Sequence, residues 1–161
     1  GVAKTSQTVQ IFGEMTALDN VAVAALTRHR RLSDAREAAL NELEFWGLSD
    51  HAGKRAQDLT LAQRSTLELA RALSLEPTIL LVDEVMAGLN ELEVDQMLER
   101  FGRANSQRGV TLVVIEHNMR ALMKISDRIL ALDYGEIIAL DLPEKVSTHP
   151  RVVEAYLGVS E

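Results

Sequence analysis

Two stretches of sequence decide the fold, ILLVDE at residues 79–84 and LVVIEH at residues 112–117. Each contains four consecutive β-branched or leucine residues and then ends abruptly in charged or polar side chains. Unbroken apolar runs of this kind are typical of strands that a parallel sheet buries on both faces. Between them lies an apolar stripe at helical spacing, formed by Val94, Met97, Leu98 and Phe101. Residues 79–115 therefore predict one strand–helix–strand unit of a parallel α/β sheet.

The chain on either side of this unit is mostly helical in pattern. Ahead of it we expect helices over about residues 18–26, 33–46 and 62–75, with Ser33 capping the second helix. Beyond it we expect a short helix, then a β-hairpin turned at residues 133–135, and finally two further short helices. This order predicts a helical part followed by the sheet.

The 161-residue chain has the composition of a globular domain, with 47% hydrophobic and 25% charged residues. Its 24 Asp and Glu residues exceed its 17 Lys and Arg residues, which argues against nucleic acid as a partner. Cysteine is absent, which excludes disulfides and thiolate chemistry. The apolar runs are far shorter than the roughly 20 residues of a membrane span. We expect a cytoplasmic location, and we expect the chain to begin inside a longer protein.

Polar side chains follow both predicted strands at the point where each strand ends. Asp83 and Glu84 follow the first strand, and Glu116 and His117 follow the second. Because ligands of open α/β sheets bind at the carboxyl ends of the strands, we expect these groups to share a site. One carboxylate suits Mg²⁺, a second can orient or deprotonate water, and an imidazole can bond a phosphate oxygen. The alternative interpretation is that each strand ends in solvated charges before a helix.

Five short motifs resemble, in order, those of ABC transporter ATPases. They are AKTSQ at residues 3–7 (Q-loop), LTLAQ at 59–63 (signature motif), ILLVDE at 79–84 (Walker B), AGLN at 87–90 (D-loop) and IEH at 115–117 (H-loop). Further stretches are similar to the ATPase subunit of branched-chain amino-acid importers, among them IFGEMTALDNV at 11–21, EHNM at 116–119 and PRVVEAYLG at 150–158. Each motif alone is unspecific, but their order and spacing are specific, and the resemblance covers nearly the whole chain.

The resemblance implies an α/β fold: an incomplete P-loop NTPase (RecA-like) core with a parallel sheet, joined to an α-helical ABC signalling subdomain. Residues 1–76 would hold the Q-loop and the helical subdomain with the signature motif. Residues 77–161 would form the C-terminal half of the nucleotide-binding core. The phosphate loop of the family, Gly-x-x-x-x-Gly-Lys-Ser/Thr, does not occur in the sequence. We therefore interpret the chain as the C-terminal part of a longer ATPase.

The resemblance also implies ATP and Mg²⁺ as cofactors. Asp83 would hold Mg²⁺ through water, and Gln7 would touch the Mg²⁺ or the attacking water. Glu84 would be the catalytic base, and His117 would contact the γ-phosphate. The other nucleotide contacts are implied for Thr60, Leu61, Ala62, Gln63 and Asn90, the first four toward ATP held by a second subunit. Ala62 stands where the family has glycine, and its Cβ would crowd that contact.

The function that the resemblance implies is that of an energy-coupling subunit, which hydrolyses ATP to drive import of branched-chain or related amino acids. Such a subunit pairs head to tail with a second ATPase subunit, identical or related, and docks membrane-spanning permease subunits near residues 7–15. It would be peripheral on the cytoplasmic face of the cell membrane, held there by the permease. Two alternatives stay open. One is a non-catalytic remnant or docking module, and the other is an unrelated parallel-sheet domain.

For the 161 residues alone we predict no appreciable ATP hydrolysis. The sequence supplies neither the backbone N–H cradle nor the lysine that hold the β- and γ-phosphates. Phosphate release measured with and without Mg²⁺ checks this. Mg²⁺-dependent turnover that Glu84→Gln abolishes would contradict the prediction.

Overall fold

The computed structural model describes residues 1–6 and 9–157. Contacts divide the chain into two compact units, Gly1–His117 and Asn118–Glu161. The division predicted after residue 76 follows the roles of the motifs and stays a prediction. In the first unit the elements are β1 (Val2–Lys4), α1 (Ala17–Ala25), α2 (Leu32–Phe45), 3₁₀ turns at Ser49–His51 and Ala56–Asp58, α3 (Leu61–Leu73), β2 (Ile79–Asp83), α4 (Glu91–Arg108) and β3 (Thr111–Ile115).

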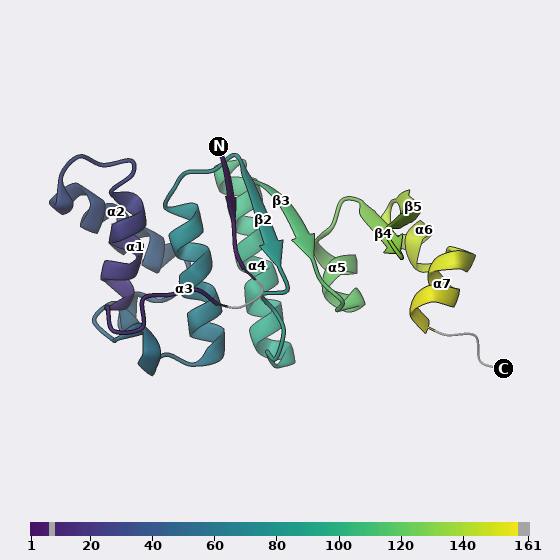
Figure 1. Ribbon diagram of the computed structural model, residues 1–161, viewed down its shortest axis with the longest axis horizontal. Helices are drawn as coiled ribbons and strands as arrows, with labels where there is room; N and C mark the ends of the chain where they lie inside the picture. The colour runs from purple at the N-terminus through teal and green to yellow at the C-terminus, as the bar shows by residue number, and fades with distance from the viewer. Residues whose placement is uncertain (7–8, 158–161) are drawn as a thin grey trace. The chain divides into compact units, whose positions relative to one another are not determined.

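A parallel sheet in the order β1-β2-β3 organises the first unit (Figure 1). β2 and β3 pair residue for residue, from Ile79 opposite Thr111 to Asp83 opposite Ile115. This confirms the predicted strand–helix–strand unit, with α4 as its helix and Gly109 ending that helix at a φ of 65°. β1 was not expected as a strand, because three residues are too few to show a strand pattern.

The expectation that the strands are buried on both faces is wrong for this unit. Ala3, Leu80 and Val82 are buried on the face where α3 packs against β1 and α4 against β3. On the opposite face, Val113 is 48% exposed and Ile115 is 60% exposed. Helices of the first unit cover only one side of the sheet, so the other side stays open within the described part of that unit.

Helices α1, α2 and α3 pack on one another beside the sheet (Figure 1). The Trp46 ring, just after α2, is fully buried and lies edge-to-face with Phe101 of α4, with ring centroids 6.2 Å apart. The predicted cap Ser33 is wrong, because α2 begins at Leu32 and the Ser33 hydroxyl instead donates to the neighbouring Asp34 carboxylate at 2.8 Å. A serine inside the first turn can no longer reach the free N–H groups that a cap satisfies.

The second unit contains a hairpin and three short helices, as the sequence predicts. Its elements are α5 (Met119–Ile125), β4 (Ile129–Asp133), β5 (Glu136–Asp141), α6 (Pro143–Ser147) and α7 (Pro150–Leu157). The antiparallel strands turn at Tyr134 and Gly135, which both have positive φ, as a tight hairpin turn requires. The apolar core of this unit is Ile129, Ala131, Ile138, Val146 and Val152.

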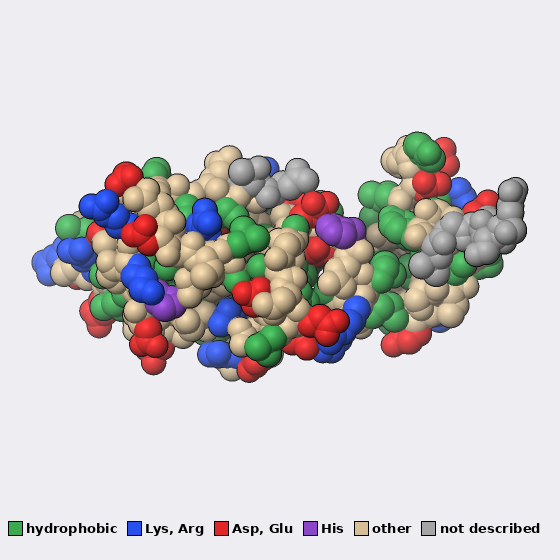
Figure 2. All heavy atoms as spheres, turned by 90° about the horizontal axis from the view of Figure 1, so that it is seen from below, with side chains coloured by type: hydrophobic (Ala, Val, Ile, Leu, Met, Phe, Trp, Pro, Cys, Tyr) green, Lys and Arg blue, Asp and Glu red, His purple; other side chains and the backbone are tan. Residues whose placement is uncertain are grey.

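The surface of this acidic chain has a basic corner. Figure 2 shows Lys and Arg side chains gathered over the α1–α2 end of the first unit, with Asp and Glu interspersed. Arg28, Arg30 and Arg31 are exposed there, and Arg28 pairs with Glu76 at 2.7 Å.

No helix in the described ranges is both long and apolar enough to span a bilayer.

We expect the exposed apolar face of the sheet to make the chain self-associate. Val113→Lys should reduce this self-association, because it places a charge in the middle of that face. Light scattering at matched concentrations measures the effect. Thr111→Lys is the matched control, since Thr111 is an exposed residue at the end of the same strand and face. A wild-type chain that is a monodisperse monomer with a cooperative melt would contradict the prediction.

Candidate functional site

The ends of β2 and β3 bring together the polar groups that the sequence singles out. The Glu84 N–H donates to the Ile115 carbonyl at 3.0 Å, which continues the sheet ladder one residue past Asp83. Nδ1 of His117 lies 3.9 Å from Oε1 of Glu84. Asp83, Glu84 and His117 therefore share one edge of the sheet.

Glu84 has an unusual backbone conformation, with a φ of 48°. A residue with a Cβ in this left-handed region costs roughly 1–2 kcal/mol relative to the ordinary conformation. Strain of this kind concentrates at functional sites, where the surrounding structure holds it in place. Here the surroundings are the bond to Ile115 and a tight turn in which the Ala87 N–H donates to the Glu84 carbonyl.

Glu116 has a structural task that the sequence did not reveal. Its Oε1 accepts a hydrogen bond at 3.0 Å from the N–H of Met86, in the loop that follows β2. Burial raises the pKa of Glu116 above its ordinary value, although the bond from Met86 opposes this shift. Glu116 thus fastens the end of β3 to the loop that carries Glu84. The only signal for Glu116 in the sequence is its position next to His117 at the end of a predicted strand.

Asp83 is held by the chain that follows β1. Its N–H donates to Oγ1 of buried Thr5 at 3.2 Å, and the Thr5 N–H donates to the Leu81 carbonyl at 2.9 Å. Among the described residues, no three acidic or histidine side chains gather as a complete metal site. A Mg²⁺ ion that keeps several waters and binds phosphate needs only one or two protein carboxylates, so Asp83 fits such an ion. Gln7, the other predicted ligand, lies outside the described residues.

The predicted signature residues form the start of α3. Thr60 and Gln63 make a capping box: Oγ1 of Thr60 accepts from the Gln63 N–H, and Oε1 of Gln63 accepts from the Thr60 N–H. Nε2 of Gln63 also lies 2.7 Å from Nε2 of His51. Leu61 is exposed and Ala62 is partly buried. This geometry is also that of an ordinary capped helix, so the contact of these residues with ATP stays a prediction.

The predicted D-loop lies against the start of α3. A Cβ added to Gly88 would be 3.1 Å from Cδ2 of Leu61, and Gly88 has a φ of 77°. Asn90, at the end of this loop, caps α4 in a second capping box with Glu93. The loop that follows Glu84 therefore contacts Leu61, the first residue of α3.

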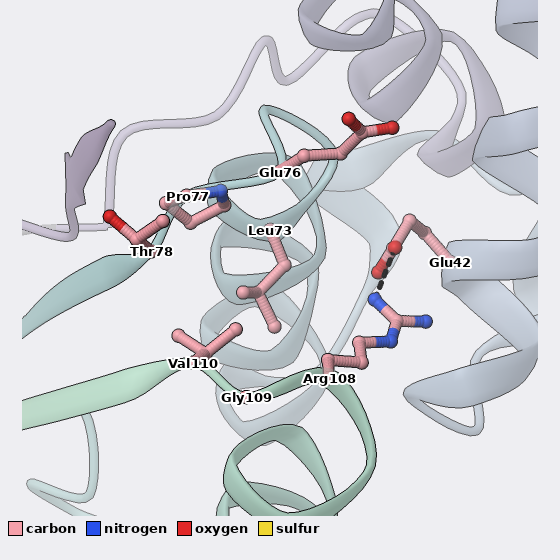
Figure 3. Close-up of a pocket in the computed structure, with 8 residues that line it drawn as sticks. All are labelled: Glu42, Leu73, Glu76, Pro77, Thr78, Arg108, Gly109 and Val110. Carbon is pink, nitrogen blue, oxygen red and sulfur yellow. Dashed lines mark hydrogen bonds and ion pairs between the residues drawn. The ribbon is translucent and has the colours of Figure 1, made fainter.

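A cavity of about 420 Å³ lies at the other edge of the sheet, near the N-terminal ends of β2 and β3. Figure 3 shows its lining, which is Glu42, Leu73, Glu76, Pro77, Thr78, Arg108, Gly109 and Val110. The Arg108 guanidinium pairs with the Glu42 carboxylate and lies 3.8 Å from the centre of the Phe45 ring. Burial raises the pKa of Glu42, and Arg108 opposes that shift. None of the predicted site residues lines this cavity.

Family comparisons agree with this geometry. Residues 1–87 match the model described as ABC transporter, and residues 136–161 match the model described as branched-chain amino acid ATP-binding cassette transporter. The high-affinity branched-chain amino acid transport ATP-binding protein BraF of Pseudomonas aeruginosa is 36% identical, over 98% of this chain and 68% of that protein. The corresponding LivG protein of Escherichia coli is 35% identical over the same shares.

Solved structures show the same fold. The ADP conformation of MJ1267, an ATP-binding cassette of an ABC transporter, has a TM-score of 0.84 and 26% identity, covering 98% of this chain and 68% of that one. The chain is an α/β protein with the architecture of an ATP-binding cassette. It belongs to the ABC transporter family, in the group of branched-chain amino acid transport ATP-binding proteins.

Arg108→Met should lower the free energy of unfolding by about 3 kcal/mol at pH 7.5, because it leaves the Glu42 carboxylate buried without its partner. The loss should shrink toward pH 4.5. A raised pKa in the folded state means that ionised Glu42 opposes folding, and its protonation at low pH removes this penalty. Urea unfolding at several pH values measures both effects.

Arg103→Met is the matched control. Arg103 also stacks on Phe45, with its guanidinium carbon 4.6 Å from the ring centre, so its loss should cost less than about 1 kcal/mol at any of these pH values. If both variants lost the same free energy of unfolding at every pH, the Glu42–Arg108 pair would not be the source of the stability that Arg108 provides.

Proposed function

We propose that the chain is the ATP-binding, energy-coupling subunit of an ABC importer for branched-chain or related amino acids. The observation that supports this most is the 3.9 Å approach of Glu84 and His117, beside Asp83, at the ends of adjacent parallel strands. The names of the relatives, branched-chain amino acid transport ATP-binding proteins, support the cargo. The ADP conformation of MJ1267 supports a nucleotide as the ligand.

In this proposal each strand-end group has its own role. Asp83 would hold Mg²⁺ through water, and Gln7 would be a further contact to the ion or the attacking water. When bound, Mg²⁺ would neutralise charge on the phosphates. Glu84 orients and deprotonates the attacking water, and His117 donates a hydrogen bond to the γ-phosphate. Phosphoryl transfer depends mainly on positioning and charge, which these groups supply from one rigid sheet edge.

The start of α3 would face a nucleotide held by a second ATPase subunit. Its 13-residue helix presents free N–H groups and a positive dipole end, which favour phosphate. Asn90 would contribute from the adjacent D-loop. Residues 1–76 would signal to the permease whether ATP is bound. Residues 77–161 would carry the groups that act on the ATP bound by the same subunit. Permease subunits would hold the pair at the cytoplasmic face of the membrane.

A non-catalytic docking module is the second candidate function. The observation that favours it is that the side chains of Thr60 and Gln63 are already engaged in the helix cap. Such a module would keep the surface that contacts the permease and would bind no ATP.

Binding of a fluorescent ATP analogue with Mg²⁺ distinguishes the two functions. We would compare the 161 residues with the chain extended by any residues that its gene encodes upstream. We expect only the extended protein to bind and hydrolyse ATP. Glu84→Gln should lower its kcat at least about 100-fold and leave binding intact, because the base acts in the chemical step.

Glu91→Gln is the matched control, since Glu91 is an exposed glutamate that opens α4. Its kcat should stay within about twofold of wild type. Failure of both proteins to bind would overturn the ATPase proposal in favour of the docking module.

A further inference from the structure

Glu68 is a buried carboxylate that the proposed chemistry does not use. It lies in the middle of α3 and is 6% exposed. Burying a carboxylate is costly unless hydrogen bonds compensate, and burial indeed raises the pKa of Glu68. Its Oε1 accepts hydrogen bonds from the N–H of Ser6 at 3.2 Å and from the N–H of Gln10 at 3.4 Å. The carboxylate therefore satisfies the backbone N–H groups of Ser6 and Gln10, which lie about 60 residues away in the sequence.

Arg71, three residues further along α3, contacts Gln10 as well. Its guanidinium donates to the Gln10 carbonyl and lies 4.9 Å from the centre of the Phe12 ring. Residues three apart share one face of a helix, so Glu68 and Arg71 reach the loop together. Gln10 is thus bonded through both its N–H and its carbonyl group.

The other end of this contact reaches the candidate site. Ser6 directly follows Thr5, which accepts the N–H of Asp83 and donates to the Leu81 carbonyl. A continuous path of hydrogen bonds and one peptide unit therefore leads from Asp83 through Thr5 and Ser6 to Glu68. An apolar side chain at position 68 would leave the N–H groups of Ser6 and Gln10 without this acceptor.

We propose that Glu68 is a positioning residue: by accepting hydrogen bonds from the N–H groups of Ser6 and Gln10, it fixes α3 relative to the Asp83 end of β2. The hydrogen bonds of Glu68 alone support this connection between α3 and the segment that follows β1. Its role, which is to keep the start of α3 and the Asp83 end of β2 correctly placed for ATP, rests on the proposed function. Arg71 adds contacts to the Gln10 carbonyl and the Phe12 ring.

Nuclear magnetic resonance of the 161-residue chain tests the link without nucleotide. Amide protons bonded to a carboxylate resonate downfield and exchange slowly. Glu68→Gln keeps the shape and one acceptor oxygen but removes the charge, and Glu68→Leu removes the acceptor as well. We expect the Ser6 and Gln10 amide protons to move upfield in both variants. Their hydrogen exchange should speed up about tenfold in Glu68→Gln and more in Glu68→Leu.

Amides inside α4 report on global stability and should keep their exchange rates in Glu68→Gln. Glu37→Gln is the matched control, because it makes the same change at an exposed glutamate of α2 and should leave Ser6 and Gln10 unchanged. Unaltered Ser6 and Gln10 amides in Glu68→Gln would overturn the proposal. So would a uniform change across α4, which would make Glu68 a general stability residue.

This result and the ATP-binding result can fail separately. If the Ser6 and Gln10 amides shift and exchange faster in Glu68→Gln, but the protein never binds ATP, the link is upheld and the ATPase role is rejected. If these amides are unchanged in Glu68→Gln, but the protein hydrolyses ATP, the link is rejected and the ATPase role is upheld.

Discussion

The parallel pairing of β2 with β3, in the register that sets Asp83 opposite Ile115, is the constraint on which the rest of the site depends. A slip of one residue would turn each side chain of a strand to the other face of the sheet. It would bury Leu81 in place of Leu80 and move Glu84 away from His117. The register is held by the buried face, where Leu80 and Val82 are almost fully enclosed.

The loops around the strand ends are fastened by single polar side chains. Glu116 holds the Met86 N–H, Thr5 holds the Asp83 N–H, and Glu68 holds the N–H groups of Ser6 and Gln10. Each of these side chains is wholly or partly buried, so its bonds are stronger than they would be in water. Glu84, whose backbone is in the left-handed region, lies among the segments that these hydrogen bonds hold in place. A rigid frame of this kind suits chemistry that works by positioning.

The sequence predicts the periodic parts of this fold well, because burial imposes the pattern there. The runs at 79–82 and 112–115 became β2 and β3, and the turn at Tyr134 and Gly135 follows from its residue types. The predicted cap at position 33 was wrong because local hydrogen bonding favoured another arrangement: the Ser33 hydroxyl donates to Asp34, and the observed cap is Arg31, two residues earlier. β1 escaped notice because its partner strand, not its own pattern, makes it a strand.

The gathering of the strand-end groups was predictable from the sequence, but the residues that hold them in place were not. Asp83, Glu84, Glu116 and His117 stand out as polar groups at strand ends, and parallel pairing requires them to meet. Glu68 and Thr5 do not stand out, because their partners are backbone groups far away in the chain. No local pattern marks a side chain whose task is to bond a distant loop.

The most direct test of the account is a crystal structure of the chain, with any residues its gene encodes upstream, bound to Mg²⁺ and a non-hydrolysable ATP analogue. The account predicts Mg²⁺ within one water of the Asp83 carboxylate, the γ-phosphate within hydrogen-bond distance of His117, and the attacking water next to Glu84. A nucleotide bound elsewhere, such as in the cavity lined by Glu42 and Arg108, would contradict it, because the paired strand ends would then have no part in the chemistry.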